Sequence, residues 1–184
     1  MNILAFGASN NRQSINRTLA THAAHLVEVA RVKVIDIADY EMPLFSDERE
    51  QALGQPLQAR SFFEEIASAD AIVVSFAEHN GSYTAAYKNL FDWTSRISQK
   101  VFQGKPVVYL STSPGPGGAG SVLASAIASA PFFGADVIAS LSVPSFQNNF
   151  NLEQNQWVNP EIRQALETVM EQLADAVHRD CKAA

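Results

Sequence analysis

Short apolar runs alternate along the chain with longer segments in which apolar residues recur at helical spacing. Five of the short runs are rich in valine and isoleucine and nearly continuous, which favours buried strands covered on both faces. The predicted strands are residues 3–7, 32–37, 71–76, 107–111 and 137–143, and the predicted helices are residues 14–29, 56–67, 85–97, 121–133 and 161–177. This alternation is typical of βαβ units built around a parallel sheet.

Five strands and five helices in this order predict one α/β domain over residues 1–184, a three-layer doubly wound sheet with five parallel strands. Ligands of such sheets bind beyond the carboxyl ends of the strands, where the strand order switches direction. Three loops are therefore the places to look for function: residues 8–13, 77–84 and 112–120.

Composition narrows the class of protein. The 184 residues are 47% hydrophobic and 17% charged, as expected of a globular chain, and the net charge of −6 without a basic run argues against nucleic-acid binding. One cysteine excludes an intrachain disulfide, and no apolar stretch approaches the roughly 20 residues of a membrane span, so a cytoplasmic location is expected. His22 and His25 lack a third ligand nearby, so no metal is expected.

The first loop gathers hydroxyls, amides and the guanidinium of Arg12 at the start of a predicted helix. Unpaired backbone N–H groups and the positive end of the helix dipole face the same space, which suits a monophosphate dianion. The expected donors are the Ser9 and Ser14 hydroxyls, the Asn16 amide and backbone N–H groups. Alternatively, Ser14 is only an N-cap in a polar loop.

The second and third loops point to a flat ligand at the same edge. Asn80-Gly81 permits left-handed backbone that can aim an N–H at the edge of a ring such as isoalloxazine, although this dipeptide is also common in plain turns. The G-x-G-x-x-G of Gly115, Gly117 and Gly120 follows the fourth predicted strand instead of the first. It therefore indicates close approach of backbone to a ligand and is no dinucleotide fingerprint.

Together these segments resemble the NADPH-dependent FMN reductase family, which includes quinone, azo-dye and chromate reductases. The resemblance spans almost the whole chain. The matching pieces are Ser9 with Ser14-Ile15-Asn16, Glu78-His79-Asn80-Gly81-Ser82, Lys88-Asn89 with Asp92-Trp93 and Ser95-Arg96, Lys105-Pro106, and the loop from Ser113 to Gly118. This chain departs from the family pattern at Asn11, where an arginine is usual and the adjacent Arg12 is a substitute, and at His79, where a tyrosine is usual.

The resemblance implies a flavodoxin-like fold with strand order 2-1-3-4-5, noncovalent FMN, and NADPH or NADH as electron donor. It also implies ping-pong electron transfer to a small acceptor, such as a quinone, free flavin, azo compound or metal oxyanion, by a homodimer or homotetramer. No side chain is expected to be an essential acid or base. The expected FMN-binding residues are Ser9, Asn11, Arg12, Ser14, Ile15, Asn16, Glu78, His79, Asn80, Gly81, Ser82, Ser113, Pro114, Gly115, Gly117 and Gly118.

Three further expectations concern single features. Asp36 ends the second predicted strand and is expected to be a solvated acid. The resemblance suggests that the helix carrying Trp93 helps to form a subunit interface, which would explain its large aromatic side chains. The polar residues 145–157 are expected either to cover the flavin or a neighbouring subunit's site, or to form a mobile surface loop. The main rival function is a non-enzymatic FMN electron carrier or redox sensor. A hydrolase using Ser9 or Ser113 lacks the G-x-S-x-G elbow and identifiable histidine and acid partners.

Overall fold

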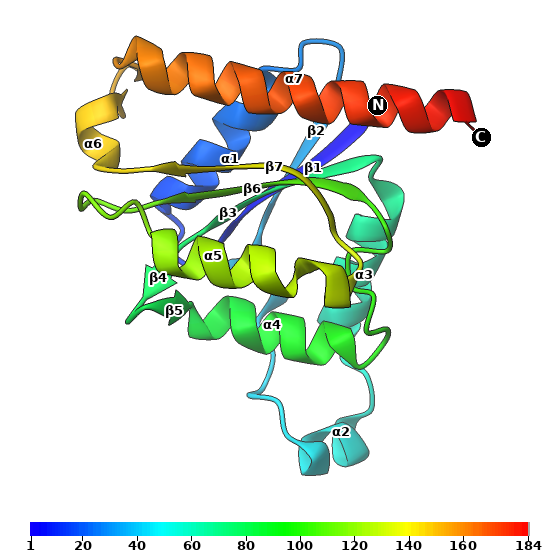
Figure 1. The fold of residues 1–184 in the computed structure, drawn as a ribbon. Coiled ribbons are helices and arrows are strands. Elements are labelled where there is room, and N and C mark those ends of the chain that lie inside the picture. The colour runs from blue at the N-terminus through cyan, green and yellow to red at the C-terminus, as the bar shows by residue number, and fades with distance from the viewer. Residues whose placement is uncertain (184) are drawn as a thin grey trace.

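A five-stranded parallel sheet forms the centre of the computed structural model, which describes residues 1–183 (Figure 1). Its strands lie in the order β2-β1-β3-β6-β7, so the predicted order 2-1-3-4-5 is confirmed when only the strands of this sheet are counted. Their bounds are β1 (Asn2–Ala8), β2 (Arg31–Asp36), β3 (Ala71–Phe76), β6 (Pro106–Thr112) and β7 (Asp136–Val143).

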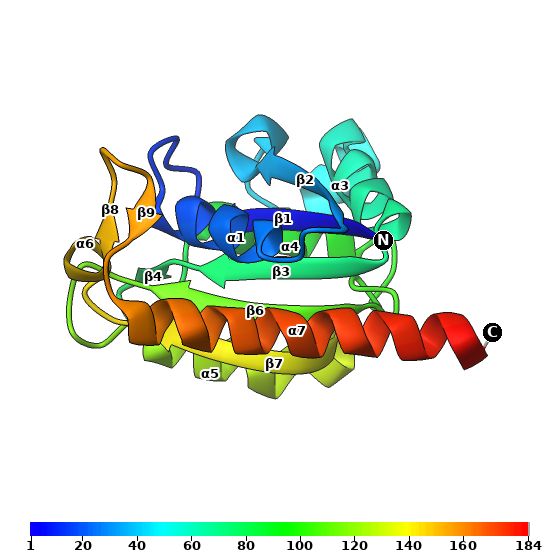
Figure 2. The same ribbon diagram turned by 90° about the horizontal axis from the view of Figure 1, so that it is seen from above.

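Helices cover both faces of the sheet and make the predicted three layers (Figures 1 and 2). One layer holds α1 (Ile15–His25) and α7 (Pro160–Ala183), and the other holds α3 (Leu57–Ser68), α4 (Ala85–Ser95) and α5 (Gly120–Ser129). Asn159 accepts a hydrogen bond from the N–H of Glu161 at 3.0 Å and so caps the start of α7.

Alternation along the central strands explains why both layers are apolar. In β1, Ile3 and Ala5 pack toward α1 and α7, while Leu4 and Phe6 pack toward the opposite layer. Successive side chains of a strand point to opposite faces, so a strand with a helix on each side must be apolar at every position. The continuous apolar runs of the central strands have this origin.

The edge strand β2 departs from the expectation that every strand is covered on both faces. Arg31, Lys33 and Val34 are exposed, because β2 pairs only with β1 and lies at the border of the sheet. The apolar run that was predicted to continue through Ile37 also ends earlier, since Ile37 begins a 3₁₀ turn, η1 (Ile37–Tyr40). Valines at alternate positions occur both in edge strands and in interior strands, so the sequence did not show that β2 lies at the edge of the sheet.

Three helices end earlier than predicted, and for α4 the difference is small, since it ends at Ser95 instead of residue 97. The segment after His25 leaves α1 as a turn, and the predicted helix 121–133 is divided into α5 and a 3₁₀ turn, η2 (Ala130–Phe133). Pro131 lies in the first turn of η2, where its ring and missing N–H prevent α5 from continuing. Gly134 then takes a left-handed conformation and closes the segment.

Several short helices and two-residue strands lie in the segments that connect the main strands and helices. They are α2 (Asp47–Leu53), α6 (Phe146–Asn149), and the hairpins β4 (Glu78–His79) with β5 (Ser82–Tyr83) and β8 (Phe150–Asn151) with β9 (Gln156–Trp157). Residues 145–157, predicted to be a polar loop, thus contain a short helix and a hairpin.

A subunit interface does not explain the large side chain of Trp93, contrary to the prediction. Its side chain is fully buried within the chain, its indole N–H donates to the carbonyl of Pro43 at 2.7 Å, and its ring meets Phe45 edge to face. The large aromatic side chain therefore holds the segment that precedes α2 against α4.

No helix within residues 1–183 is both long and apolar enough to cross a membrane.

Candidate functional site

A cavity of about 480 Å³ opens at the carboxyl edge of the sheet, where the loops after β1, β3 and β6 meet. The strand order switches between β1 and β3, so this is the place at which doubly wound sheets bind ligands. The predicted convergence of the three loops is confirmed. The lining residues are Ser9, Asn10, Asn11, Gln13, Ser14, Ile15, Asn16, Ala77, Glu78, His79, Thr112, Ser113, Pro114 and Gln147.

The amino end of α1 presents two free backbone donors to this cavity. The Ser14 hydroxyl accepts from the N–H of Arg17 at 3.3 Å, so Ser14 caps the helix as the sequence allowed. Within the described residues, no acceptor is found for the N–H groups of Ile15 and Asn16. Ser9 and Ser14 are almost fully buried, and each retains a hydroxyl proton to donate.

Asn16 has a structural task that its sequence position did not reveal. Its side-chain amide donates to the carbonyl of Thr112 at 3.1 Å and accepts from the N–H of Thr112 at 3.0 Å and the hydroxyl of Ser75 at 2.7 Å. One amide proton predicted to face a phosphate is therefore used inside the protein. Asn16 instead fixes the start of α1 against the ends of β3 and β6, which positions the free N–H groups.

Arg12 does not take the place predicted for it. Its guanidinium is exposed and pairs with Asp39 at 2.8 Å and Asp36 at 3.4 Å, which raises its pKa. Arg12 does not line the cavity, whereas Asn11 does. The cavity therefore contains no lysine or arginine among its lining residues, and a phosphate bound there would depend mainly on N–H groups, hydroxyls and the helix dipole.

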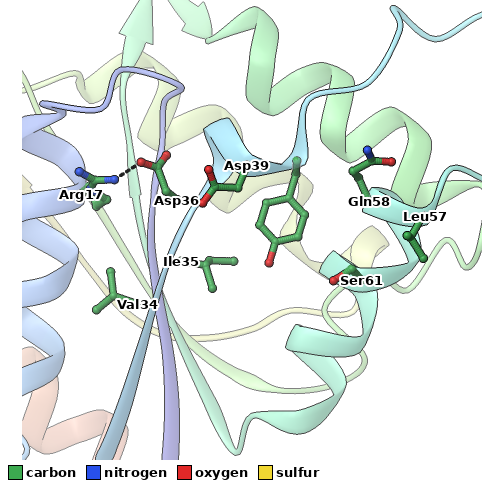
Figure 3. A pocket seen from close by; sticks show the side chains of 9 residues that line it. Arg17, Val34, Ile35, Asp36, Asp39, Leu57, Gln58 and Ser61 are labelled. Atoms are coloured by element: carbon green, nitrogen blue, oxygen red, sulfur yellow. Dashed lines mark hydrogen bonds and ion pairs between the residues drawn. The ribbon is translucent and has the colours of Figure 1, made fainter.

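Asp36 is not the solvated acid that was expected. Only 10% of its side chain is exposed, it pairs with Arg17, and it accepts the N–H of Ala38 at 3.0 Å as the cap of η1. A second cavity of about 550 Å³ lies beside this pair between β2 and α3 (Figure 3). Asp39 also borders this second cavity. Two acidic side chains therefore face one cationic side chain, that of Arg17, which disfavours binding of a phosphate there.

The hairpin after β3 has the left-handed turn that its sequence predicted. Asn80 has φ 53° and Gly81 has φ 78°, so both central residues are left-handed, as in a type I′ turn. Glu78 and His79 line the cavity, whereas Asn80, Gly81 and Ser82 form the exposed tip and do not. Thr84 anchors the hairpin, since its hydroxyl donates to the carbonyl of Ala8 at 2.9 Å.

Glu78 connects two of the three loops. Its carboxylate accepts the N–H of Val122 at 2.9 Å, in the first turn of α5, so it both caps that helix and meets the positive end of its dipole. The predicted ring loop is thus held against the glycine-rich loop by a side chain, a role that the loop sequence did not indicate.

We expect Glu78→Ala to lower the free energy of unfolding by about 1 kcal/mol and Glu78→Gln by about half of that, because glutamine keeps the acceptor but loses the charge. Urea denaturation measures both values. Glu161→Ala is the matched control, since Glu161 is also in the first turn of a helix but its carboxylate caps no helix in the described part of the chain. Equal losses for Glu78→Ala and Glu161→Ala would contradict the capping role.

The glycines of the third loop lie mainly outside the cavity. Ser113 and Pro114 line it, but Gly115, Gly117 and Gly118 do not. The carbonyl of Gly118 accepts from the hydroxyls of Ser111 and Ser142 at 2.7 and 2.9 Å, and a Cβ at this position would lie 2.2 Å from the Ser142 oxygen. Close approach of backbone was predicted for Gly115, Gly117 and Gly120, yet a Cβ at any of these would meet nothing within 4 Å. The close contact is at Gly118 instead, and its neighbour is β7.

Five lining residues were not among the predicted binding residues. Gln147 shows that part of the polar segment 145–157 reaches the cavity, and this segment is held by the N–H of Phe146 donating to the carbonyl of Ser113 at 3.1 Å. Four of the five lie inside the three predicted loops, so membership of these loops was the available signal, and for Gln147 it was the polar character of segment 145–157. The five are Asn10, Gln13, Ala77, Thr112 and Gln147.

The amino-acid sequence matches the family model described as NADPH-dependent FMN reductase over residues 1–148. It is 38% identical over 82 residues to an NAD(P)H-dependent FMN reductase of Pseudomonas aeruginosa, which covers 44% of either protein. It is 35% identical over 101 residues to a quinone reductase of Escherichia coli K12, which covers 55% of this chain and 52% of that protein. The chain thus spans about half the length of these curated relatives.

Solved structures support the fold. A flavoenzyme NAD(P)H:(acceptor) oxidoreductase from Paracoccus denitrificans superposes with a TM-score of 0.76 at 21% identity, covering 97% of both chains. An oxidoreductase from Corynebacterium diphtheriae superposes with a TM-score of 0.70 at 16% identity, covering 97% of this chain and 98% of that one. At these identities the similarity establishes the flavodoxin-like architecture.

Proposed function

This chain belongs to the NADPH-dependent FMN reductase family, and from that premise we propose that it binds FMN in the cavity at the carboxyl edge and oxidises NAD(P)H. The observation that carries the proposal is the pair of unpaired N–H groups, from Ile15 and Asn16, beside the hydroxyls of Ser9 and Ser14. Such a group of neutral donors at a helix amino end fits a phosphate dianion.

Each loop has a separate task in this proposal. The start of α1 would hold the phosphate, while Ala77, Glu78 and His79 on one side and Ser113 with Pro114 on the other would border the ring. When bound, FMN supplies the redox chemistry by accepting a hydride from the nicotinamide and passing two electrons to an acceptor. The protein binds and orients, and we assign no side chain as an essential acid or base.

Several finer points belong to the same proposal. A small quinone is the favoured acceptor, because relatives in several organisms are named quinone reductases, while free flavin, azo compounds and metal oxyanions are alternatives. We also infer from the family a single domain that assembles into a homodimer or homotetramer in the cytoplasm. Of the predicted binding residues, Arg12, Asn80, Gly81, Ser82, Gly115, Gly117 and Gly118 are assigned to supporting roles around the site.

The purified protein is expected to retain FMN absorbance after incubation and desalting, and to lose it promptly when NADPH is added without oxygen. Ser14→Ala should weaken FMN binding by about tenfold, since it removes a hydroxyl that hydrogen-bonds a charged group. The visible spectrum and a fluorescence titration measure the two effects.

Ser46→Ala is the matched control for this variant. The Ser46 hydroxyl caps α2 by accepting the N–H of Arg49 at 3.2 Å, as Ser14 caps α1, but it lies outside the cavity. Both substitutions should therefore cost about 1 kcal/mol of stability, and only Ser14→Ala should affect FMN. A protein that does not retain FMN would refute the proposal.

The rival function, a non-enzymatic electron carrier or redox sensor, predicts a different result when NADPH is added without oxygen and the visible spectrum is recorded. FMN would be retained, but NADPH would not bleach it. The present observations favour the enzyme because FMN reductases and quinone reductases are the named relatives.

A further inference from the structure

A second, smaller cavity of about 160 Å³ lies between α4 and α5, which run side by side over the same face of the sheet (Figure 1). It shares no lining residue with the cavity proposed to bind FMN. Its walls come from the sheet and from both helices and are mostly aromatic. The aromatic lining residues are Phe76, Tyr83, Tyr87, Phe91, Phe102, Tyr109 and Phe133.

These rings form a connected wall. Phe76 meets Tyr87 and Tyr109 edge to face, with ring centroids 5.5 and 5.0 Å apart. On the far side Phe91 meets Phe133 edge to face at 4.7 Å. Both distances and angles match those preferred by interacting aromatic pairs, so the rings stabilise one another around the space they enclose. The cavity is therefore bounded by mutually supporting side chains.

Two phenol groups in this wall lack partners. Tyr87 is 4% exposed and Tyr109 is 2% exposed, yet neither hydroxyl makes a hydrogen bond to any residue that the structure describes. Burial raises the pKa of both phenols, so each remains protonated and able to donate at neutral pH. Neither oxygen is among the fully buried polar atoms without a partner in the described part of the chain, so both can be reached from the cavity and can bond to a molecule inside it.

Size and polarity define the ligand that fits. An apolar cavity of about 150 Å³ holds one benzene ring, so a space of this volume admits a single ring and excludes the three-ring isoalloxazine. Apart from the tyrosines, the polar side chains that line the cavity are a Lys88–Asp92 ion pair at 2.6 Å, Ser95, and Ser129, whose hydroxyl lies 3.5 Å from that of Tyr83. The aromatic walls favour a flat, neutral guest.

We propose that this cavity is a binding site for one neutral, single-ring aromatic molecule that carries an oxygen atom, which accepts hydrogen bonds from Tyr87 and Tyr109. The ring of the guest would occupy the space enclosed by the aromatic side chains. The site is separate from the cavity proposed to bind FMN, so the inference does not depend on the function proposed above.

Calorimetry with phenol and with toluene tests this site in the full-length protein, both with and without added FMN. We expect one molecule of phenol to bind per chain, about fivefold more tightly than toluene, and equally well in both preparations. The double variant Tyr87→Phe/Tyr109→Phe should bind both probes with similar affinity. Its matched control is Tyr40→Phe, whose hydroxyl lies at a different cavity and whose loss should leave the fivefold preference unchanged.

A second variant keeps the test independent of the tyrosines. Ala126 is buried and lines the cavity, so Ala126→Leu should fill the space and abolish binding of both probes. Absence of saturable binding to the wild-type protein would mean that the cavity holds only water and would overturn the proposal. An unchanged phenol preference in the double tyrosine variant would overturn it equally.

Discussion

Replacing Gly7 with alanine is expected to destabilise the protein by about 3 kcal/mol or more, because the added methyl has no space. A Cβ at this position would lie 2.4 Å from the backbone nitrogen of Arg17 and 2.8 Å from its Cα. These are backbone atoms at the start of α1, so no side-chain rotation relieves the contact. Either α1 moves away from β1 or the strand distorts, and urea denaturation measures the loss.

The same substitution should impair FMN binding, because the free N–H groups of Ile15 and Asn16 move with the helix. Gly115→Ala is the matched control, since a Cβ at Gly115 meets nothing within 4 Å. We expect that control to change stability by less than about 1 kcal/mol. Similar losses in both variants would show that the contact between β1 and α1 is not what makes Gly7 necessary.

The architecture followed from the sequence because it depends on a repeated pattern. The strands β1, β3 and β6 are covered on both faces, so their apolar runs were continuous and their positions were predicted to within a residue at each end. The predictions were weaker where a single residue opposes the apolar pattern around it. Pro131 is an example, because it divides a helix that the apolar spacing alone predicted to be unbroken.

The site was predictable as a set of loops and less so as a set of side chains. The order of the strands brings the three loops together whatever their residues are, which is why the cavity lies where it was expected. The partners of individual side chains depend on distant segments. Arg12 follows Asn11 in the chain, yet its guanidinium turns to Asp36 and Asp39, which a local motif does not encode.

Asn16 shows the same limit most clearly. It was predicted to donate to a phosphate because it lies among other polar donors at the start of the first helix, but its partner Thr112 is 96 positions away in the sequence. The amide of Asn16 satisfies both backbone groups of Thr112, much as a neighbouring strand would. The contact is possible only because α1 and the end of β6 meet at the carboxyl edge.

Asn16→Ala is therefore expected to lower the free energy of unfolding by about 4 kcal/mol. The substitution leaves the N–H and carbonyl of Thr112 and the hydroxyl of Ser75 without their partner, and each unsatisfied buried group costs about 1–3 kcal/mol. The loss should appear as a lower midpoint in urea, accompanied by weaker retention of FMN because the start of α1 is no longer fixed.

Asn10→Ala provides the control, since Asn10 also lines the cavity but is exposed and makes no side-chain hydrogen bond within the described residues. It should change stability by less than about 0.5 kcal/mol.

Asn16→Asp separates the two roles of the amide further. Aspartate can still accept from Thr112 and Ser75, but it repels the Thr112 carbonyl and a bound phosphate. We therefore expect Asn16→Asp to bind FMN more weakly than Asn16→Ala when both are measured under conditions in which they are folded. The reverse order would mean that Asn16 lies too far from the phosphate to influence it.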